Sequence, residues 1–464
     1  MMLEYFNVEL PGDAATGSDV QIDLFAKAGE ADAERCLLLC SAAAELSYVL
    51  EEKIAADELT NLYKNVELPL VEIMASMEYA GFAIDKEILS AEGAFLSRNI
   101  ARISEEIYNL AGETFNINSP IQLGTVLFEK LGLPAGKKTK RGYSTNAEVL
   151  ERLADEHPIV KLVLEYRMLS KLNGTYVEGL LPMIGDDGRI HAHFQQTVTT
   201  TGRISCTEPN LQNIPIKQEQ GRRLRKAFVP GNGYASLIGA DYSQIELRVL
   251  ADMAGDKNLI EAFLHGDDIH RITAARVFNV EPKDVTSAQR SAAKAVNFGV
   301  IYGMGSFSLS GEIHVTRKQA QEYIDEYFKR YSDVKRFMDD GIAFCRKNGY
   351  VKSMLNRRRY IKEINASNMM VQQAGVRLAM NSPIQGSAAD IIKLAMIKVY
   401  DAMKAEDMQS RLILQVHDEL IIEAAPGEEE KAEQLLKRCM ESAATLKVRL
   451  ISSLSRGGNW YELK

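Results

Sequence analysis

The hydrophobic positions form two kinds of pattern along the chain. Apolar residues three or four apart predict long helices over residues 66 to about 180 and over most of 256–380. Two continuous apolar runs, "YASLIGADY" (234–242) and "LILQVHDELIIEA" (412–424), are typical of buried strands. Residues 1–65 are helical in pattern, rather acidic, and without a catalytic constellation. Together these patterns predict an α+β fold, with many helices around a small sheet.

The second apolar run has a polar centre. Its two halves are separated only by His417, Asp418 and Glu419. A solvated turn is one interpretation, since Asp is common in turns. A rigid metal site is the other, because Asp241 ends the first run where a helix is expected to begin, a position that also suits an N-terminal cap. If the two strands are neighbours, Asp241 and Asp418 converge, and hard carboxylate oxygens favour Mg²⁺.

The segment "TSAQRSAAKAVNFGVIYGMG" (286–305) carries Arg290, Lys294, Phe298 and Tyr302 at intervals of four. Such spacing places them on one face of a helix. This face has two interpretations. In the first, its basic end is solvated and its aromatic end is packed. In the second, it forms a nucleotide site in which the cations hold a triphosphate. A P-loop NTPase is disfavoured, because the GxxxxGK[ST] pattern does not occur.

Composition is that of an ordinary globular protein, with 46% hydrophobic and 25% charged residues among 464, so we expect several subdomains. No apolar run approaches the roughly 18 residues of a membrane span. The start of the chain has no basic and apolar leader pattern, so no signal peptide is expected. The five cysteines lack zinc-binding spacing, which suits a reducing cytoplasm. Cys36 and Cys40 lie one helical turn apart and are expected in the core.

The net charge of −8 argues mildly against nucleic acid as a partner. The basic residues are nevertheless clustered, in the runs 137–143, 222–226, 346–352 and 356–362. These runs indicate either solvated faces or phosphate-binding surfaces.

Five segments, taken in order, resemble the sequence blocks of family A DNA polymerases, the bacterial DNA polymerase I type. They are "TTGRISCTEPNLQNIP" (200–215), "DYSQIELRVLA" (241–251, motif A), "RSAAKAVNFGVIYG" (290–303, motif B), "NSPIQGSAADIIK" (381–393) and "VHDE" (416–419, motif C). The resemblance covers roughly residues 66–464. It implies a right-hand fold with an antiparallel palm sheet, helical fingers and a helical thumb, and template-directed DNA synthesis.

The resemblance also implies a division of the chain. Residues 1–65 would be a truncated, inactive remnant of a 3′–5′ exonuclease-like domain, and 66–185 the thumb and the start of the palm. Residues 186–255 would form the palm with motif A, 256–375 the fingers with motif B, and 376–464 the palm with motif C.

Roles at the reacting centre follow from the same resemblance. Asp241 and Asp418, with the backbone carbonyl of Tyr242, would bind two Mg²⁺ ions, for which Mn²⁺ can substitute. Glu419 would assist beside them, and Lys294 would donate a proton to the leaving pyrophosphate. The reaction would be in-line attack of the primer 3′-OH on the α-phosphate.

The implied substrates are deoxynucleoside triphosphates and primer–template DNA, acted on by a monomer in the bacterial cytoplasm, at the nucleoid, with no membrane. Nucleotide contacts would come from Arg290, Lys294, Phe298, Tyr302, Glu246, Gln244 and His270. Glu246 matches the gate that excludes a ribose 2′-OH, and Phe298 implies discrimination against dideoxynucleotides. DNA contacts would come from Arg203, Gln385, Arg377, His417, Asn381, Lys138 and Lys140. Arg and Gln can test pair shape in the minor groove, where the acceptors are nearly the same for all correct pairs.

The segment "FLHGDDIHRITA" has the composition of a metal site, with His265, Asp267, Asp268 and His270. We favour structural or nucleotide-proximal roles for these residues, since the family has a similar block in the fingers.

The sequence departs from the family at several positions. Ala26 and Glu30 stand where the proofreading site would have Tyr and Asp, so neither a 3′–5′ exonuclease nor a 5′ nuclease is expected. Ser453 and Ser455 occupy positions where an acidic residue and a Gly are usual, and Val376 replaces a frequent Glu. None of these changes removes an expected metal ligand.

Four alternatives were weighed against this interpretation. A single-subunit RNA polymerase should have Gly in place of Glu246, and a reverse transcriptase should have a Tyr-x-Asp-Asp turn. A non-catalytic DNA-binding protein on the same scaffold could lose Asp241, Asp418 and Lys294, and all three are present. Specialised lesion-bypass members of the family stay open.

Overall fold

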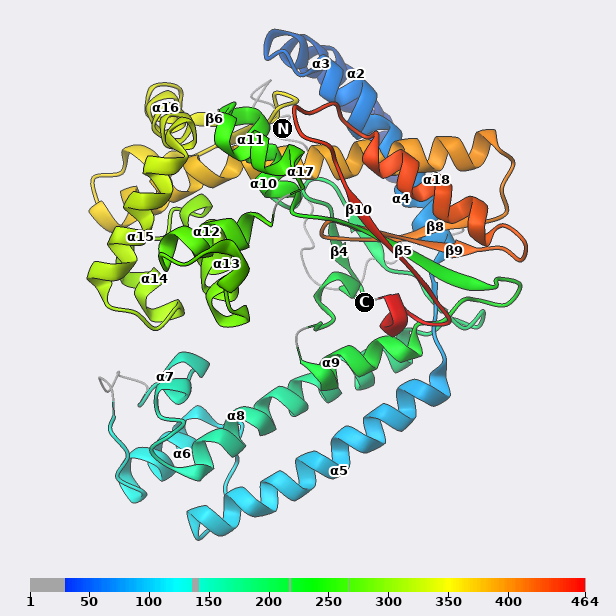
Figure 1. The fold of residues 1–464 in the computed structure, drawn as a ribbon. Coiled ribbons are helices and arrows are strands. Elements are labelled where there is room, and N and C mark those ends of the chain that lie inside the picture. Colours follow the sequence, from blue (N-terminus) through cyan, green and yellow to red (C-terminus); the bar gives the residue numbers. More distant parts are fainter. Residues whose placement is uncertain (1–29, 136–141, 217, 267, 464) are drawn as a thin grey trace.

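The structure, a computed structural model, describes residues 30–135, 142–216, 218–266 and 268–463. Long helices surround one central four-stranded sheet (Figure 1), which confirms the predicted α+β class. Ala26, Lys138, Lys140 and Asp267 lie outside the described residues.

The central sheet has the strand order β10-β5-β9-β8 and is antiparallel throughout. Its strands are β5 (Ser236–Tyr242), β8 (Arg411–Val416), β9 (Glu419–Ala424) and β10 (Ser452–Gly457). All six residues of β9 are buried, because elements cover both faces of the sheet. Burial on both faces explains why β8 and β9 appear in the sequence as nearly continuous apolar runs.

Three helices pack directly on this sheet. They are α4 (Leu68–Ala80), α17 (Met369–Ala405) and α18 (Glu429–Glu441). The first two contact β8, and α18 contacts β5, β9 and β10. In Figure 1, α17 crosses behind the sheet and α18 lies in front of it.

An antiparallel pair of helices extends below the sheet (Figure 1). It consists of α5 (Lys86–Ala111) and α8 (Pro158–Lys171), the latter continuing into η3 (Leu172–Glu178). Asp85 caps α5 by accepting a 2.9 Å hydrogen bond from the Ile88 amide. The far end carries three short elements, α6 (Pro120–Gly124), η2 (Thr125–Lys130) and α7 (Ala147–Arg152).

A second group of helices lies beside the sheet and α17. It comprises α11 (Lys257–Leu264), α12 (Ile269–Val277), η7 (Pro282–Asp284), α13 (Ser287–Ile301), α14 (Ser306–Glu312), α15 (Arg317–Arg330) and α16 (Ser332–Asn348). We call this group the helical lobe. A capping box begins α13: the Thr286 hydroxyl accepts from the Gln289 amide at 3.2 Å, and the Gln289 side chain accepts from the Thr286 amide at 2.9 Å.

Short elements connect these parts. They are α3 (Thr60–Leu62), η1 (Tyr63–Glu67), β1 (Phe82–Ala83), η4 (Leu181–Met183), β2 (Arg189–Ile190), β3 (His193–Gln195), β4 (Ser205–Thr207), η5 (Leu211–Asn213), α9 (Glu219–Arg223), η6 (Leu224–Ala227), α10 (Ile245–Ala254), β6 (Tyr350–Lys352), β7 (Arg358–Tyr360), η8 (Lys362–Asn365) and η9 (Trp460–Leu463).

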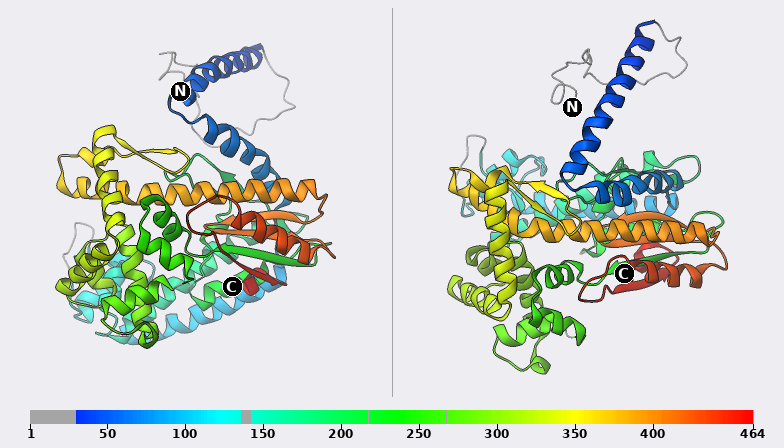
Figure 2. Two further views of the ribbon diagram at one scale, coloured as in Figure 1. Left: turned by 45° about the horizontal axis from the view of Figure 1, so that its top comes forward. Right: turned by 90° about the horizontal axis from the view of Figure 1, so that it is seen from above.

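The helix α2 (Glu30–Ala56) projects away from the rest of the protein (Figure 2). Cys36 and Cys40 are exposed on it, so the prediction that they lie in the core is wrong. The reason is that the projecting helix has few neighbours there, and Leu37 on the same segment is 70% exposed. Within the described ranges, no helix combines the length and apolar character needed to cross a bilayer.

Two of the basic runs do not present all their arginines to solvent. Arg223 pairs with Glu92 at 2.8 Å, and the buried Arg225 guanidinium lies 4.0 Å from the centroid of the Trp460 ring. Arg357 and Arg358 likewise pair within the protein. These four arginines therefore make contacts within the protein.

Gly303 lies between α13 and α14, where the helical lobe packs closely against α17. Its φ is +65°, and a Cβ there would lie 2.9 Å from Arg377 Cγ and 3.2 Å from Met380 Sδ. We predict that Gly303→Ala lowers the free energy of unfolding by about 2–3 kcal/mol, from backbone strain plus overlap. Gly255, with φ +64° and nothing within 4 Å of an added Cβ, is the matched control. Urea denaturation should show that Gly255→Ala loses only about 1 kcal/mol of the free energy of unfolding. Equal losses in both variants would contradict the packing argument.

Candidate active site

The pairing of β5 with β9 brings the two candidate carboxylates together. Asp241 lies directly opposite Glu419 in the register, and the Tyr242 amide donates to the Asp418 carbonyl at 3.1 Å. The hairpin turn between β8 and β9 is two residues long, with His417 at φ +53°. Asp241 and Asp418 are half-buried, whereas Glu419 is 1% exposed. The expectation that the two strands are neighbours is confirmed.

Tyr242 offers its backbone rather than its side chain to this corner. Its hydroxyl donates to the Met440 carbonyl at 2.6 Å inside the protein. Burial raises the pKa of the Tyr242 phenol, and the charge of Asp418 adds to that rise. The chain then turns through Gln244, at φ +54°, into α10, whose first turn carries Glu246.

A cavity of about 340 Å³ lies between the sheet corner and the helical lobe. Its lining residues come from five separate parts of the chain. They are Arg203, Gln244, Ile245, Glu246, His270, Arg290, Lys294, Phe298, Tyr302 and Asp418. All but Ile245 were candidates from the sequence, so the structure brings nearly the whole expected nucleotide site into one place.

Glu246 is held between two partners in this cavity. Arg203 donates to one carboxylate oxygen at 3.0 Å, and the Tyr302 hydroxyl donates to the other at 2.7 Å. Burial raises the pKa of Tyr302, and the Glu246 charge adds to that rise, while a hydrogen bond with Gln385 opposes it. The buried carboxylate therefore links α10, the residue that follows α13, and the loop that carries Arg203.

The four-residue stripe lies on α13 as predicted, with Tyr302 capping the helix end. The Phe298 and Tyr302 rings stack with centroids 6.3 Å apart. Arg290 pairs with Asp268 at 2.6 Å, and Asp268 also caps α12 by accepting from the Arg271 amide at 3.1 Å. This cap and ion pair confirm a structural role for Asp268.

Two further members of that acidic and histidine segment lie among the described residues, in different surroundings. His265 ends α11 on the surface, whereas His270 lines the cavity. Among the described residues there is no group of three or more His, Cys, Asp or Glu side chains placed to share a metal ion.

His270 is fixed by residues that the sequence analysis missed. Its Nδ1 lies 2.9 Å from the Asn297 amide nitrogen, and the Thr273 hydroxyl donates to the Asn297 oxygen at 3.0 Å. Burial lowers the pKa of His270 to about 4; Arg290 and Lys294 add to this effect, and Asp268 opposes it. The signal for Asn297 was a polar residue within the apolar stretch "AVNFGVI".

Of the candidate DNA contacts, Arg203 lines the cavity, whereas Arg377, Asn381, Gln385 and His417 are not among its lining residues. Arg377, Asn381 and Gln385 recur every four residues along α17, next to the end of α13. The Asn381 side-chain oxygen is buried, with no hydrogen-bond partner among the described residues. His417 is exposed next to Asp418.

Comparison with known proteins matches residues 86–462 to the model of DNA polymerase family A. The chain belongs to this family. Over 404 residues it is 51% identical to DNA polymerase I of Caldicellulosiruptor bescii, covering 87% of this chain and 47% of that protein. Over 433 residues it is 48% identical to DNA polymerase I of Geobacillus stearothermophilus, covering 93% and 49%. The chain thus spans about half the length of these relatives.

A solved structure of the same family shares the fold. The POL domain of Pol1 from M. smegmatis, in complex with DNA primer-template and dNTP, superposes with a TM-score of 0.91 at 40% identity. The match covers 100% of this chain and 78% of that one. The α+β polymerase fold expected from the motifs is therefore confirmed.

Two of the departures from the family pattern, Ser453 and Ser455, lie on β10 beside β5. Ser453 pairs with Asp241 in the β10–β5 register, and its hydroxyl is 3.3 Å from that of Ser243. Ser455 donates to the Leu463 carbonyl at 2.5 Å. Ser453 thus leaves no acidic side chain across from Asp241 on the β10 side.

The neutral His270 makes stability depend on pH. Its folded pKa of about 4 lies below the unfolded value of about 6.5, so below pH 6.5 the unfolded state gains a proton that the folded state lacks. The contribution of His270 to the free energy of unfolding should therefore fall by up to about 1.4 kcal/mol for each pH unit between pH 6.5 and 4. His270→Gln should therefore unfold with a weaker pH dependence than wild type in urea titrations at pH 7, 6 and 5.

His265→Gln, at the exposed end of α11, controls for the loss of an imidazole. Parallel pH profiles for wild type and His270→Gln would contradict the assignment of a neutral, buried ring.

Proposed function

We propose that the chain catalyses template-directed DNA synthesis, adding deoxynucleotides to a primer 3′-OH with release of pyrophosphate. The carrying observation is the single cavity in which Arg290, Lys294, Phe298 and Tyr302 of the lobe face Asp418 of the sheet. This arrangement supports a site with cations for a triphosphate at one end and a carboxylate corner at the other. Family membership supports the same activity.

The donor set at the sheet corner fits hard divalent cations. Asp241 and Asp418 present carboxylates from two adjacent strand ends, and Tyr242, which follows Asp241, is bonded through its amide to the Asp418 carbonyl. The two carboxylates and the Tyr242 carbonyl would hold two Mg²⁺ ions, with Mn²⁺ as a substitute. Such ions, when bound, activate an attacking hydroxyl and stabilise the leaving oxygen.

The residues of α13 would bind and orient the nucleotide. Arg290 is paired with the carboxylate of Asp268, so a phosphate can replace one anion with another at the same guanidinium. Lys294, one turn further along, would contact the triphosphate and donate a proton to pyrophosphate. Phe298 would pack on the sugar and Tyr302 would border the base pair. Gln244 and His270, which line the same cavity, would complete the nucleotide contacts.

The remaining assignments extend this proposal to DNA. Arg203, Arg377, Asn381, Gln385 and His417 would contact the primer terminus and the minor groove, and Glu419 would support the carboxylate corner. The antiparallel helix pair would act as thumb, the helical lobe as fingers and the sheet as palm, within the boundaries predicted from the motifs. The active species would be a monomer on bacterial chromosomal DNA in the cytoplasm.

A primer-extension gel tests the activity. A 5′-labelled primer on a longer DNA template is incubated with Mg²⁺ and dNTPs, with rNTPs, or without nucleotide. Extension with dNTPs alone is expected. No extension in any lane would favour a non-catalytic DNA-binding protein, and shortening without nucleotide would reveal an exonuclease.

Asp241→Asn and Asp418→Asn should each lower the rate of extension by about a thousandfold or more, because ions held there stabilise the reacting oxygens by several kcal/mol. Asp340→Asn, an exposed carboxylate on α16, is the charge-matched control and should leave the rate unchanged. Single-turnover incorporation with excess enzyme measures the effect. A carboxylate variant with wild-type rate would remove that residue from the reaction.

Glu246→Ala should admit ribonucleotides. The buried carboxylate occupies the cavity wall between Arg203 and Tyr302, and its removal opens space where a 2′-OH would lie. We expect the preference for dNTP over rNTP, as a ratio of kcat/KM values, to fall by about 10- to 100-fold. An unchanged ratio would mean that Glu246 supports the fold without touching the sugar.

A further inference from the structure

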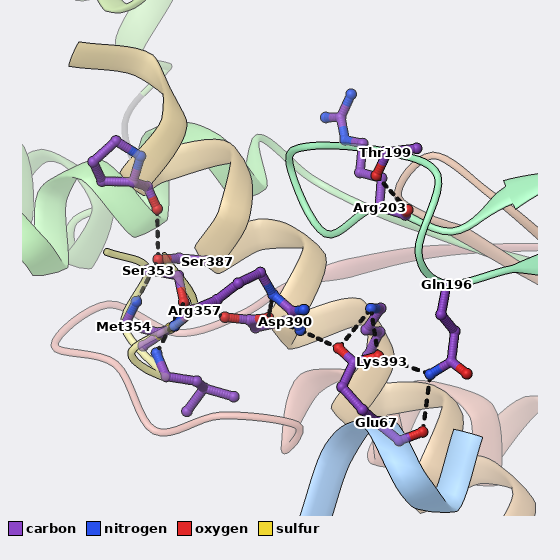
Figure 3. Close-up of polar contacts among 12 residues, drawn as sticks. Glu67, Gln196, Thr199, Arg203, Ser353, Met354, Arg357, Ser387, Asp390 and Lys393 are labelled. Atoms are coloured by element: carbon purple, nitrogen blue, oxygen red, sulfur yellow. Dashed lines mark hydrogen bonds and ion pairs between the residues drawn. The ribbon is translucent and has the colours of Figure 1, made fainter. Parts of the chain in front are cut away.

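Four charged side chains lie together beneath the loop of residues 196–203, away from the cavity (Figure 3). Glu67 ends η1, Arg357 precedes β7, and Asp390 and Lys393 lie on α17. Arg357 Nε donates to Asp390 at 2.7 Å, and Lys393 Nζ donates to Glu67 at 2.8 Å. Arg357 also donates to Glu67, which joins the two pairs into one cluster.

This cluster is nearly removed from solvent. The side chains of Asp390 and Lys393 are 0% exposed, and those of Arg357 and Glu67 are 17% and 20% exposed. Two cations balance two carboxylates. Buried ion pairs often contribute little net stability, since desolvation offsets their attraction, so stability alone gives a weak reason for this arrangement. A defined geometry is the better explanation to test.

The 196–203 loop rests on this cluster at both ends. Gln196 Nε2 donates to the Glu67 side chain at 2.7 Å and to its carbonyl at 2.9 Å. At the other end Gly202, with φ +81°, lies directly against Arg357. A Cβ at Gly202 would be 2.5 Å from Arg357 Cδ and 3.0 Å from its guanidinium carbon. The absence of a side chain at Gly202 is what allows this close approach.

The same loop delivers Arg203 to the cavity. The Thr199 hydroxyl donates to the Arg203 carbonyl at 2.6 Å, which closes the loop. The Arg203 guanidinium then reaches Glu246 at 3.0 Å, and Glu246 accepts from Tyr302 at 2.7 Å. A continuous series of contacts therefore runs from the buried cluster to the carboxylate in the cavity wall.

We propose that Arg357, held by Glu67 and Asp390, is a positioning residue that sets the place of Arg203 against Glu246 and thereby the discrimination between deoxynucleotides and ribonucleotides. The inference rests on the proposed polymerase function. Arg357 is not among the residues that line the cavity, so it acts through the loop and not by contact with a nucleotide.

Arg357→Lys in the full chain is the first test. Lysine keeps the charge but loses the flat guanidinium beneath Gly202 and its simultaneous bonds to two carboxylates. We expect KM for the correct dNTP to rise about tenfold, kcat to change by less than about threefold, and the dNTP-to-rNTP preference to fall about tenfold, because small misplacements of a site residue have effects of this size.

The neighbouring Arg358 provides the matched control. It pairs with Asp57 at 2.7 Å and makes no bond to the cluster among those recorded for the described residues. Arg358→Lys should therefore keep the wild-type preference. If Arg357 only stabilises the fold, Arg357→Lys will lower the thermal midpoint and scale the kcat/KM values for dNTP and rNTP equally, and that result would overturn the inference.

Gln196→Met is a second variant that leaves the charged cluster intact and releases only the loop. It should lower the preference in the same direction, and combining it with Arg203→Lys should give less than the product of the two single effects, since both act on one guanidinium. Independent effects, or wild-type preference in both Arg357→Lys and Gln196→Met, would overturn the inference. A wild-type chain that extends no primer would instead overturn the proposed function, and the inference with it.

Discussion

The structure depends most on the antiparallel pairing of β5 with β9. A strand register is exact to one residue, because a slip by one would turn every side chain to the opposite face. Here the register runs from Ser236 opposite Ala424 to Asp241 opposite Glu419. Asp241 and Asp418 therefore meet at one corner although 176 residues separate them in the numbering. The helices that cover the sheet hold that corner rigid, which two mutually repelling carboxylates require.

The second half of the site belongs to another element, and one carboxylate joins the halves. Glu246 stands on α10 directly after the sheet corner, yet it accepts a hydrogen bond from Tyr302 at the end of α13. It also accepts from Arg203, whose loop rests on α17 and the cluster beneath it. The bond to Tyr302 spans the helical lobe and the sheet side of the cavity, whereas the bond to Arg203 joins two parts outside the lobe.

Local patterns were enough to predict the two apolar strand segments, the helical stripe on α13 and the carboxylate of Asp418, whereas Arg203, Gln244, Glu246 and His270 were predicted from the resemblance to family A polymerases. The four-residue spacing on α13 and the apolar runs that end in Asp are properties of short segments. They can therefore be recognised in the sequence before the three-dimensional structure is known. Asn297, Glu67, Asp390 and Lys393 were missed because their importance comes from partners far away in sequence. Asp390 is 33 residues from Arg357, and Glu67 is 326 from Lys393. The exposure of Cys36 was missed for the same reason, since a helix pattern does not reveal whether anything packs against it.

Charge shows how far a whole-chain property can mislead. The net value of −8 is a sum over 464 residues, most of them far from the cavity. In water at about 0.1 M salt, exposed charges more than roughly 10 Å apart are largely screened. A ligand in the cavity therefore responds mainly to Arg203, Arg290 and Lys294 and to the nearby carboxylates. Arginines such as Arg357 count in the sum as basic, but the carboxylates paired with them offset much of their field. An acidic chain can thus carry a cationic nucleotide site, because affinity is decided by the few charges that remain within reach.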